Sequence, residues 1–278
     1  MEIRFLGTGA AEGFPAVFCS CDYCKAVRAL GAEEYRTRSQ VLIDGCLSVD
    51  FPPEAYSNSL KHGFNLGDIK YIFVTHSHMD HFYAHDFILR GYKYAKVNEP
   101  KLQIYGNAEV RAVFNECTAR EMKPQVAPDI EVCVLKPYQK IQAGEYKVLT
   151  LPAQHSQTED CLLYYIERNG KGYLHLYDAG GIEDKAFDFL AENNAKAQAV
   201  AIDCTFAEYT AGLQLRHMGI ENDMVIKQKL LDCGVIDNNT KIIITHFSHN
   251  CNPTRAHVSE LEKRYSVTAA YDGMKIEI

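Results

Sequence analysis

Long apolar runs, an excess of positive charge and linker-like segments are all missing from this chain of 278 residues. No apolar stretch approaches the ~18 residues that span a bilayer, which argues against a membrane protein. The chain opens with MEIRFLGTGA, a pattern typical of a strand and a turn rather than of an export signal. No Pro-, Gly- or Ser-rich run divides the sequence, so we expect one domain over residues 1–278. The expected protein is soluble and cytoplasmic, without a membrane partner.

Positive charge is in deficit, because 29 lysines and arginines stand against 36 aspartates and glutamates, for a formal net charge of -7. A protein that wraps long nucleic acid usually carries a net basic domain, so a long nucleic-acid partner is not expected. A small anionic substrate is still compatible with this charge. Carboxylate ligands add to the negative count, while bound divalent cations cancel it locally.

The ten cysteines are scattered through a mid-sized chain, which predicts free thiols or metal ligands rather than a disulfide framework. One cluster stands out: FCSCDYC places Cys19, Cys21 and Cys24 within six positions. Thiolates at this spacing are good zinc ligands, although a tetrahedral ion requires a fourth. The alternative is that they are three small buried apolar side chains near a turn.

Apolar runs of strand length alternate with helix-like stretches, which predicts a layered α/β fold. Residues 40–50 (QVLIDGCLSVD) form one such run, and the Asn169-Gly170 pair predicts a hairpin between two others, so we expect mixed sheets. YIFVTHSH at 71–78 and KIIITHFSH at 241–249 end alike, which suggests a duplicated scaffold with its chemistry at the strand ends. No motif assigns a role to the charged segment 101–140.

The strongest signal is THSHMDH, which places four residues of ligand type within six positions: His76, His78, Asp80 and His81. Imidazole and carboxylate together suit zinc, manganese or iron. The apolar run YIFV comes directly before the motif. Polar side chains at such a strand end are expected to line a cleft.

THSHMDH resembles the HxHxDH signature of the metallo-β-lactamase superfamily. That resemblance implies a four-layer αββα sandwich with mixed sheets and a dinuclear metal site between them. The family expects a later histidine, a bridging aspartate and a last histidine, and QHS, LYDAGG and IIITHFSH supply counterparts. The ligands implied are His76, His78 and His155 for one metal, Asp80, His81 and His246 for the other, and Asp178 shared between them.

Further motifs are similar to the phosphoribosyl cyclic phosphodiesterases of the carbon–phosphorus lyase pathway: LGTGAAEGFP, the cysteine cluster, IDCTF, RHMG, THFSH and YDGMKI. In that subfamily the three cysteines form a separate structural zinc site with a histidine three residues after the last catalytic one. The resemblance therefore implies that Cys19, Cys21 and Cys24 share a zinc ion with His249.

The function implied is hydrolysis of a small cyclic phosphodiester, such as phosphoribosyl 1,2-cyclic phosphate, by a hydroxide bridging two divalent ions. These ions are expected to be zinc or manganese, with iron as a third option. His217, in RHMG, matches a loop histidine beside the substrate and is expected to donate a proton or stabilise the phosphoryl group. Asp80 is a second catalytic candidate, and Asp50 is expected to contact a ligand from behind.

Other functions stay open, because a fold does not decide a substrate. Within the same superfamily, the alternatives are an RNA-processing nuclease and a lactone or thioester hydrolase. A third alternative is a binding module that metal ions stabilise and that has no catalytic activity. The expected partner is a small phosphorylated substrate, and a homodimer is compatible with the resemblance.

Overall fold

Two facing sheets of seven strands each form the centre of the computed structural model, which describes residues 1–208 and 216–278. The first has the order β14-β1-β2-β3-β4-β5-β6 and the second the order β13-β12-β11-β10-β9-β8-β7. The first sheet consists of β1 (Glu2–Gly7), β2 (Gln40–Ile43), β3 (Leu47–Val49), β4 (Tyr71–Phe73), β5 (Leu102–Gly106), β6 (Ile130–Val134) and β14 (Met274–Glu277). The second consists of β7 (Lys140–Ala143), β8 (Tyr146–Pro152), β9 (Leu162–Arg168), β10 (Lys171–Leu176), β11 (Ala199–Asp203), β12 (Lys241–Thr245) and β13 (Thr268–Ala269).

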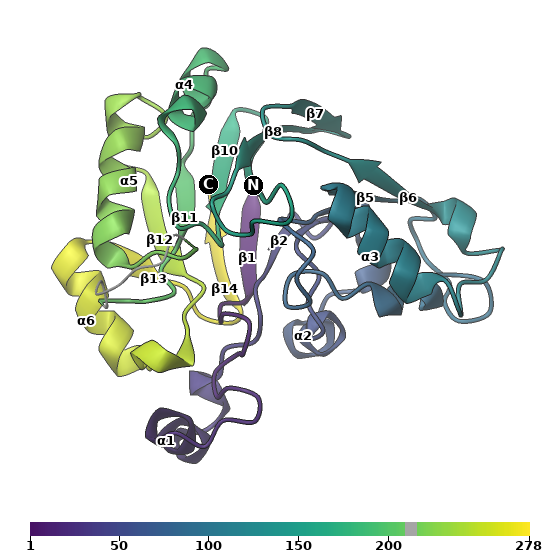
Figure 1. Cartoon of the computed structure of the whole chain (residues 1–278), viewed down its shortest axis with the longest axis horizontal. Coiled ribbons are helices and arrows are strands. Elements are labelled where there is room, and N and C mark those ends of the chain that lie inside the picture. The colour runs from purple at the N-terminus through teal and green to yellow at the C-terminus, as the bar shows by residue number, and fades with distance from the viewer. Residues whose placement is uncertain (209–215) are drawn as a thin grey trace.

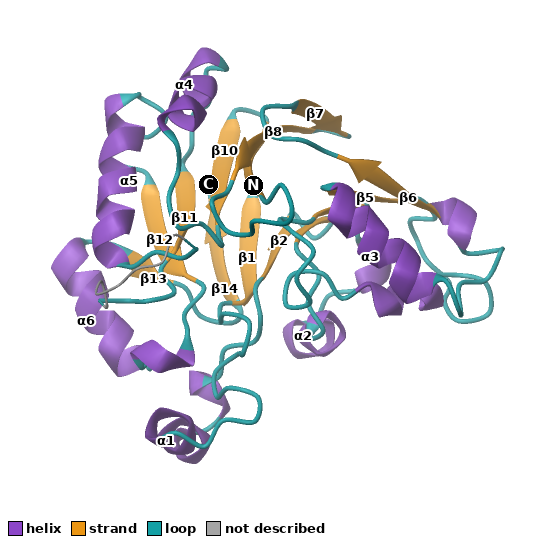
Figure 2. Cartoon of the chain, viewed as in Figure 1, coloured by secondary structure: helices purple, strands orange, loops and turns teal. Residues whose placement is uncertain are grey.

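Helices cover both outer faces of this pair of sheets (Figures 1 and 2). One side carries α2 (Ala55–His62) and α3 (Ala108–Thr118), and the other carries α4 (Asp184–Glu192), α5 (Ile220–Asp232) and α6 (Arg255–Tyr265). The short helix α1 (Asp22–Leu30) lies apart from both layers, at the bottom of the view in Figure 1. The predicted four-layer arrangement is confirmed. Within the described residues, no helix is both long and apolar enough to cross a membrane.

The two sheets repeat one pattern of pairing. Strand pairs are antiparallel from β14 to β3 and parallel from β3 to β6. In the second sheet they are antiparallel from β7 to β10 and parallel from β10 to β13. The mixed sheets expected from the sequence are confirmed, and the repeated pattern agrees with a duplicated scaffold. The segment 101–140 supplies β5 and β6, which extend the first sheet, and the helix α3 between them.

Side chains of β4 show why its apolar run is continuous. Phe73 packs between the two sheets, whereas Ile72 and Val74 pack outward among side chains from α2 and α3. Successive residues of a strand point to opposite faces, so a strand buried on both faces needs apolar residues at every position. The run therefore marks a strand inside the sandwich.

Two turns test the predictions from sequence. The Asn169-Gly170 hairpin is confirmed, with Arg168 paired to Lys171 across β9 and β10. The prediction of one strand over residues 40–50 is wrong, because Asp44 and Gly45 adopt positive φ (49° and 70°) and reverse the chain between β2 and β3. An Asp-Gly pair between apolar runs is itself a hairpin signal.

Hydrogen bonds join the two sheets beside the THSHMDH motif. The hydroxyl of Tyr164, on β9, donates to the carbonyl of Val74 at 2.6 Å, and the N–H of Leu162 donates to the carbonyl of Thr75 at 2.8 Å. Because these carbonyls directly precede His76, the second sheet fixes the segment from which the motif begins. The position of the motif thus depends on the packing of both sheets.

Tyr164→Phe should lower the free energy of unfolding by roughly 1–3 kcal/mol, because it leaves a buried carbonyl without its donor. The side chain of Tyr164 is fully buried, so water cannot replace the lost bond. Chemical denaturation of the purified variant measures the change. Tyr56→Phe is the matched control, because Tyr56 is 61% exposed and should lose little. Equal effects in the two variants would contradict this account of the contact between the sheets.

Candidate metal centres and active-site cleft

Strand ends from both sheets meet at one edge of the sandwich and supply the candidate ligands. His76 follows β4, Asp178 follows β10 and His246 follows β12. Asp178 and His246 adopt left-handed backbone, with φ of 50° and 62°, and so does Asp50 after β3, with φ of 63°. This conformation costs a residue with a side chain roughly 1–2 kcal/mol. Its occurrence at three strand ends around one site is typical of a functional constraint.

The first candidate cluster consists of His76, His78 and His155. The Nδ1 atom of His78 lies 2.9 Å from Nε2 of His76 and 3.4 Å from Nε2 of His155. The remaining nitrogen of His155 contacts the carbonyl of Arg216 at 3.0 Å, which orients the ring. Three ring nitrogens therefore converge on one small volume, as a metal ion requires.

The second candidate cluster consists of Asp80, His81, Asp178 and His246, all of them buried. Nε2 of His81 lies 2.6 Å from Oδ2 of Asp178 and 3.2 Å from Oδ2 of Asp80. Nε2 of His246 lies 3.2 Å from Oδ1 of Asp178. Oδ2 of Asp178 also lies 3.4 Å from Nε2 of His76, in the first cluster. The two oxygens of Asp178 thus stand between the two clusters, where the resemblance places a shared ligand.

Groups behind the rings hold two of these histidines in place. Oδ2 of Asp50 lies 2.6 Å from Nδ1 of His81, and Oδ1 of Asp50 accepts a hydrogen bond from the N–H of Thr75 at 2.8 Å. The hydroxyl of Thr205 lies 2.9 Å from Nδ1 of His246. Each ring is thereby left with Nε2 facing the cluster. Contacts of this kind orient metal-binding imidazoles, and Asp50 lies where the sequence predicted such a carboxylate.

The buried polar atoms of this region fit divalent cations. Nε2 of His81, Oδ1 of Asp178 and Nε2 of His246 are buried, and none makes a hydrogen bond of normal geometry with a described residue, although the rings lie 2.6 and 3.2 Å from the carboxylate. Asp50, Asp80 and Asp178 are each at most 5% exposed. Unpartnered polar atoms and adjacent buried charges of one sign are costly unless a cation compensates them. The donor set of imidazole and carboxylate suits zinc, manganese or iron.

The carboxylates also control protonation of the rings. Burial disfavours a proton on His81, but the neighbouring carboxylates, Asp178 first, outweigh it and raise the pKa of His81 well above its usual value. Burial disfavours the ionised form of Asp178, but His246 and His81 outweigh it and lower the pKa of Asp178 well below its usual range. The negative potential that holds a proton on His81 would equally favour a divalent cation.

Asp203 is a site residue that the sequence analysis did not assign. It ends β11, and its Oδ2 lies 3.1 Å from Nδ1 of His217, which is also 3.3 Å from Oδ1 of Asp178. Burial opposes a proton on His217, but Asp203 and then Asp178 outweigh it and raise the pKa of His217 to about 11. The available signal was an aspartate at the end of an apolar strand (AVAID), as at Asp50 and Asp178.

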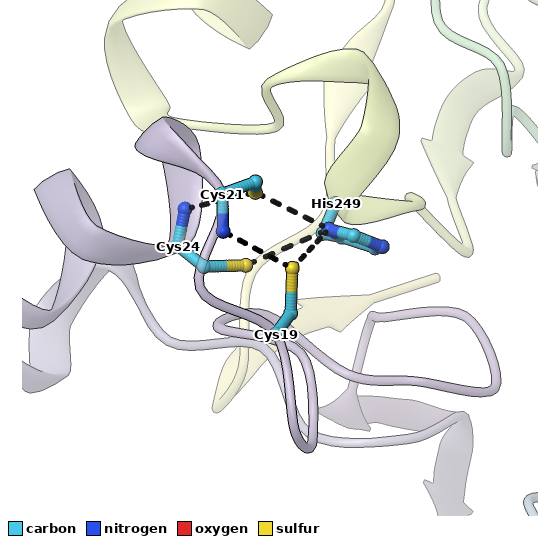
Figure 3. Close-up of side chains that lie close together, drawn as sticks. All are labelled: Cys19, Cys21, Cys24 and His249. Carbon is cyan, nitrogen blue, oxygen red and sulfur yellow. Dashed lines mark hydrogen bonds between the residues drawn. The ribbon is translucent and has the colours of Figure 1, made fainter.

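The cysteine–histidine site (Cys19, Cys21, Cys24 and His249) is separate from the cleft clusters (Figure 3). Nδ1 of His249 lies 3.7, 3.7 and 3.5 Å from the three sulfurs in that order. Tetrahedral coordination with Zn–S of about 2.3 Å and Zn–N of about 2.0 Å would place sulfur and nitrogen about 3.5 Å apart. The four side chains therefore have the spacing of a closed tetrahedral metal site.

The thiols of this site differ in acidity. The N–H of Cys24, followed by the ring of His249, stabilises the Cys21 thiolate and lowers the pKa of Cys21 to about 6. Burial raises the pKa of Cys24 to about 11. Cys251 and His257, which carry the nearest ligand-type side chains after His249 in the sequence, lie outside the cluster. Cys21 therefore offers a ready thiolate ligand, and binding a metal ion would release the proton of the Cys24 thiol.

A cleft of about 330 Å³ gives access to the clusters. Its lining consists of Ala10, Ala11, Glu12, His78, Asp80, His155, Asp178, Thr205, Phe206, Arg216, His217, His246, Ser248 and Asn250. The structure thus brings every predicted cleft residue into the clusters or the cleft wall. A larger apolar hollow of about 490 Å³, beside α2, contains none of the candidate ligands.

Comparison with known proteins identifies related folds. A family model described as beta-lactamase superfamily domain matches residues 39–247. A diphosphatase of the PhnP family matches with a TM-score of 0.73 and 20% identity, over 100% of this chain and 97% of that chain. Zinc-bound PqqB from Methylobacterium extorquens matches with a TM-score of 0.73 and 15% identity, over 100% of both chains. The short form of human tRNase Z matches with a TM-score of 0.71 and 19% identity, over 100% of this chain and 99% of that chain. No curated protein matches the sequence.

His246 and His249 are three residues apart, but replacing each should affect a different metal site. His246→Ala removes a nitrogen that faces Asp178, so it should lower the cation content of the cleft while the cysteine–histidine site keeps its ion. The His249→Ala variant should lose the ion of the cysteine–histidine site. Its Tm should fall by ~5 °C or more, because a closed metal site contributes directly to folding. Elemental analysis and calorimetry of the two variants measure both effects.

His257→Ala is the control for this pair, because His257 lies on α6 outside every candidate cluster of the described residues. It should keep both its metal content and its Tm. If His249→Ala also kept them, the fourth ligand of the cysteines would have to be another residue.

Proposed function

Because the chain belongs to the metallo-β-lactamase superfamily and is a hydrolase of that fold, we propose that it is a phosphodiesterase with two divalent cations in its cleft. The proposed substrate is a small cyclic phosphodiester such as phosphoribosyl 1,2-cyclic phosphate. One observation carries the proposal: the carboxylate of Asp178 stands between the two clusters, with Oδ2 at 3.4 Å from Nε2 of His76 in the first and at 2.6 Å from Nε2 of His81 in the second. A shared carboxylate of this kind holds two cations close together, which suits phosphoryl transfer.

The metals proposed are zinc or manganese in the cleft, with iron as a third option, and zinc in the cysteine–histidine site. When bound in the cleft, two such ions supply Lewis-acid activation of water and of the phosphoryl oxygens. Three thiolates and an imidazole leave no open position, so the second site is proposed to be structural.

The residues around the proposed cation sites have different roles: some would bind a cation, one donates a proton, and others orient these side chains. Asp80, His81 and His246 would hold one cation together with Asp178, and His81 is oriented by Asp50 at 2.6 Å. His217 lines the cleft, and its Nδ1 faces Asp203 at 3.1 Å. Its Nε2 is then the atom that can carry a proton to the departing alkoxide. Asp203 acts through His217, as a positioning residue.

Size and charge favour a small substrate over RNA. The cleft of about 330 Å³ suits a compact molecule, and the chain has a formal net charge of -7. RNA-binding proteins usually present a basic surface along which the backbone runs. All ten cysteines are free, which supports a cytoplasmic location, since disulfides are rare in that compartment.

A substrate panel tests the proposal. The enzyme is loaded separately with Mn²⁺ and with Zn²⁺ and is assayed on cyclic ribose phosphates, cyclic nucleotides, lactones and precursor tRNA. The cyclic ribose phosphate should give the highest kcat/KM, and a chelator should abolish turnover. A higher kcat/KM on a lactone or on RNA would replace the proposed function with one of these alternatives.

His217→Asn should lower turnover by ~10²-fold or more on a phosphodiester with an alkoxide leaving group, because a basic leaving group depends most on a proton donor. Nitrophenolate leaves without such help, so bis(4-nitrophenyl) phosphate should be affected much less. Measured metal content should stay the same. His257→Asn is the control, and equal losses of His217→Asn on both substrates would assign His217 to positioning instead.

A further inference from the structure

The cysteine–histidine site joins two segments that both form a wall of the catalytic cleft. The first includes Ala10, Ala11 and Glu12, which precede the cysteines, and the second includes Ser248 and Asn250, which flank His249; all five line the cleft. The backbones are also connected, since the N–H of Ala10 donates to the carbonyl of Phe247 at 3.0 Å. The site is therefore part of the architecture of the cleft wall.

Glu12 connects the cleft to the turn that carries the histidine ligand. Its Oε1 accepts hydrogen bonds from the hydroxyl of Ser248 at 2.6 Å and from the N–H of His249 at 3.3 Å. The same oxygen lies 3.8 Å from Nε2 of His249, whose other nitrogen faces the sulfurs. The side chain is 30% exposed and belongs to the cleft lining, and both hydrogen bonds that it accepts from this turn go to Oε1. One carboxylate oxygen is thus fixed by the turn, which leaves Oε2 for a donor in the cleft.

The chemistry of a carboxylate limits what Oε2 can bind. An ionised carboxylate only accepts hydrogen bonds and repels a phosphate group. The phosphodiester end of a substrate belongs at the cation ligands, so the part that reaches Glu12 must be a donor. In a phosphorylated sugar, the donor is a free hydroxyl group.

We propose that Glu12 determines specificity by accepting a hydrogen bond from a substrate hydroxyl, and that the cysteine–histidine site holds Glu12 in position for it. The inference rests on the proposed phosphodiesterase function and deepens it, because it names hydroxyl-bearing phosphodiesters as the substrate class. The metal of the cysteine–histidine site then influences substrate choice through Ser248 and His249, without contacting the substrate.

The first test compares substrates with and without hydroxyl groups. Glu12→Ala should lower kcat/KM on a cyclic ribose phosphate by ~10-fold or more beyond any loss on its O-methylated analogue and on bis(4-nitrophenyl) phosphate. The difference should lie mainly in KM, since a hydroxyl remote from the phosphorus is bound alike before and during the reaction. Asp22→Asn is the matched control, because the Asp22 side chain is fully exposed, on α1 beside the cysteines.

The second test addresses the link to the cysteine–histidine site. Cys21→Ser should reproduce the selective loss on the hydroxylated substrate while the cleft keeps its cations by elemental analysis. The double variant Glu12→Ala/Cys21→Ser should lose little more than the worse single variant, because both changes remove the same contact. Hydrogen exchange should rise at residues 10–12 and 248–250 in Cys21→Ser, a readout independent of turnover.

The outcomes separate this inference from the function on which it rests. Equal losses of Glu12→Ala on all three substrates would overturn the specificity role. Additive losses in the double variant, or unchanged exchange at residues 10–12, would overturn the link to the cysteines. If Cys21→Ser does not fold, His249→Ala, which leaves all three thiols in place, decides the link by the same substrate comparison and exchange measurement. No hydrolysis of any phosphodiester by the metal-loaded wild type would contradict the proposed function, while the exchange measurement would still decide the link.

Discussion

The carboxylate of Asp178 imposes the central constraint on this structure. It is 2% exposed, and its two oxygens must face ring nitrogens from different strand ends, His81 at 2.6 Å and His246 at 3.2 Å. A buried anion in that position is tolerable only when cations or protons surround it. Because His81 comes from the first sheet and His246 from the second, both sheets must end at the same place for the charge to be compensated. The chemistry of the site therefore depends directly on how the two sheets pack against each other.

The same constraint explains the unusual backbone at the site. Asp50, Asp178 and His246 each leave a strand in left-handed conformation, which few residues other than glycine adopt readily. Contacts of these residues oppose the relaxation of the turns: the N–H of Asp50 donates to the carbonyl of Phe73 at 2.9 Å, and the hydroxyl of Thr205 lies 2.9 Å from Nδ1 of His246. Strain is retained at a functional site when the surrounding structure determines the conformation more strongly than the residue itself. Here the buried sheets serve as that surrounding structure.

Sequence alone was informative where a residue's role follows from its neighbours in the chain. THSHMDH identified four candidate ligands because their spacing at a strand end is local, and the hairpin at Asn169-Gly170 is a local signal too. Glu12 was missed because its role arises only when distant segments meet, since it contacts Ser248 across 236 positions. Asp203 ends an apolar strand as Asp50 and Asp178 do, but its contact with His217, fourteen residues later, follows from the folded loop and not from spacing. Asp44-Gly45 was missed differently, since its turn signal stood inside an apolar run that resembled one strand. Roles that depend on contacts in the folded chain could not be predicted from the sequence, whereas the turn was a local pattern that was misinterpreted.

The turn after β12 serves two sites at once. His246 points to Asp178 and is held from behind by Thr205 at 2.9 Å, while His249, three residues later, faces the sulfur of Cys24 at 3.5 Å. A ligand that orders this turn from either side reduces the conformational freedom that the other must remove. Binding free energies are coupled reciprocally. If an ion in the cysteine–histidine site raises the affinity of the cleft for its cations, those cations must raise the affinity of the cysteine–histidine site by the same factor. The short spacing between the two histidines makes the turn a physical connection between folding and catalysis.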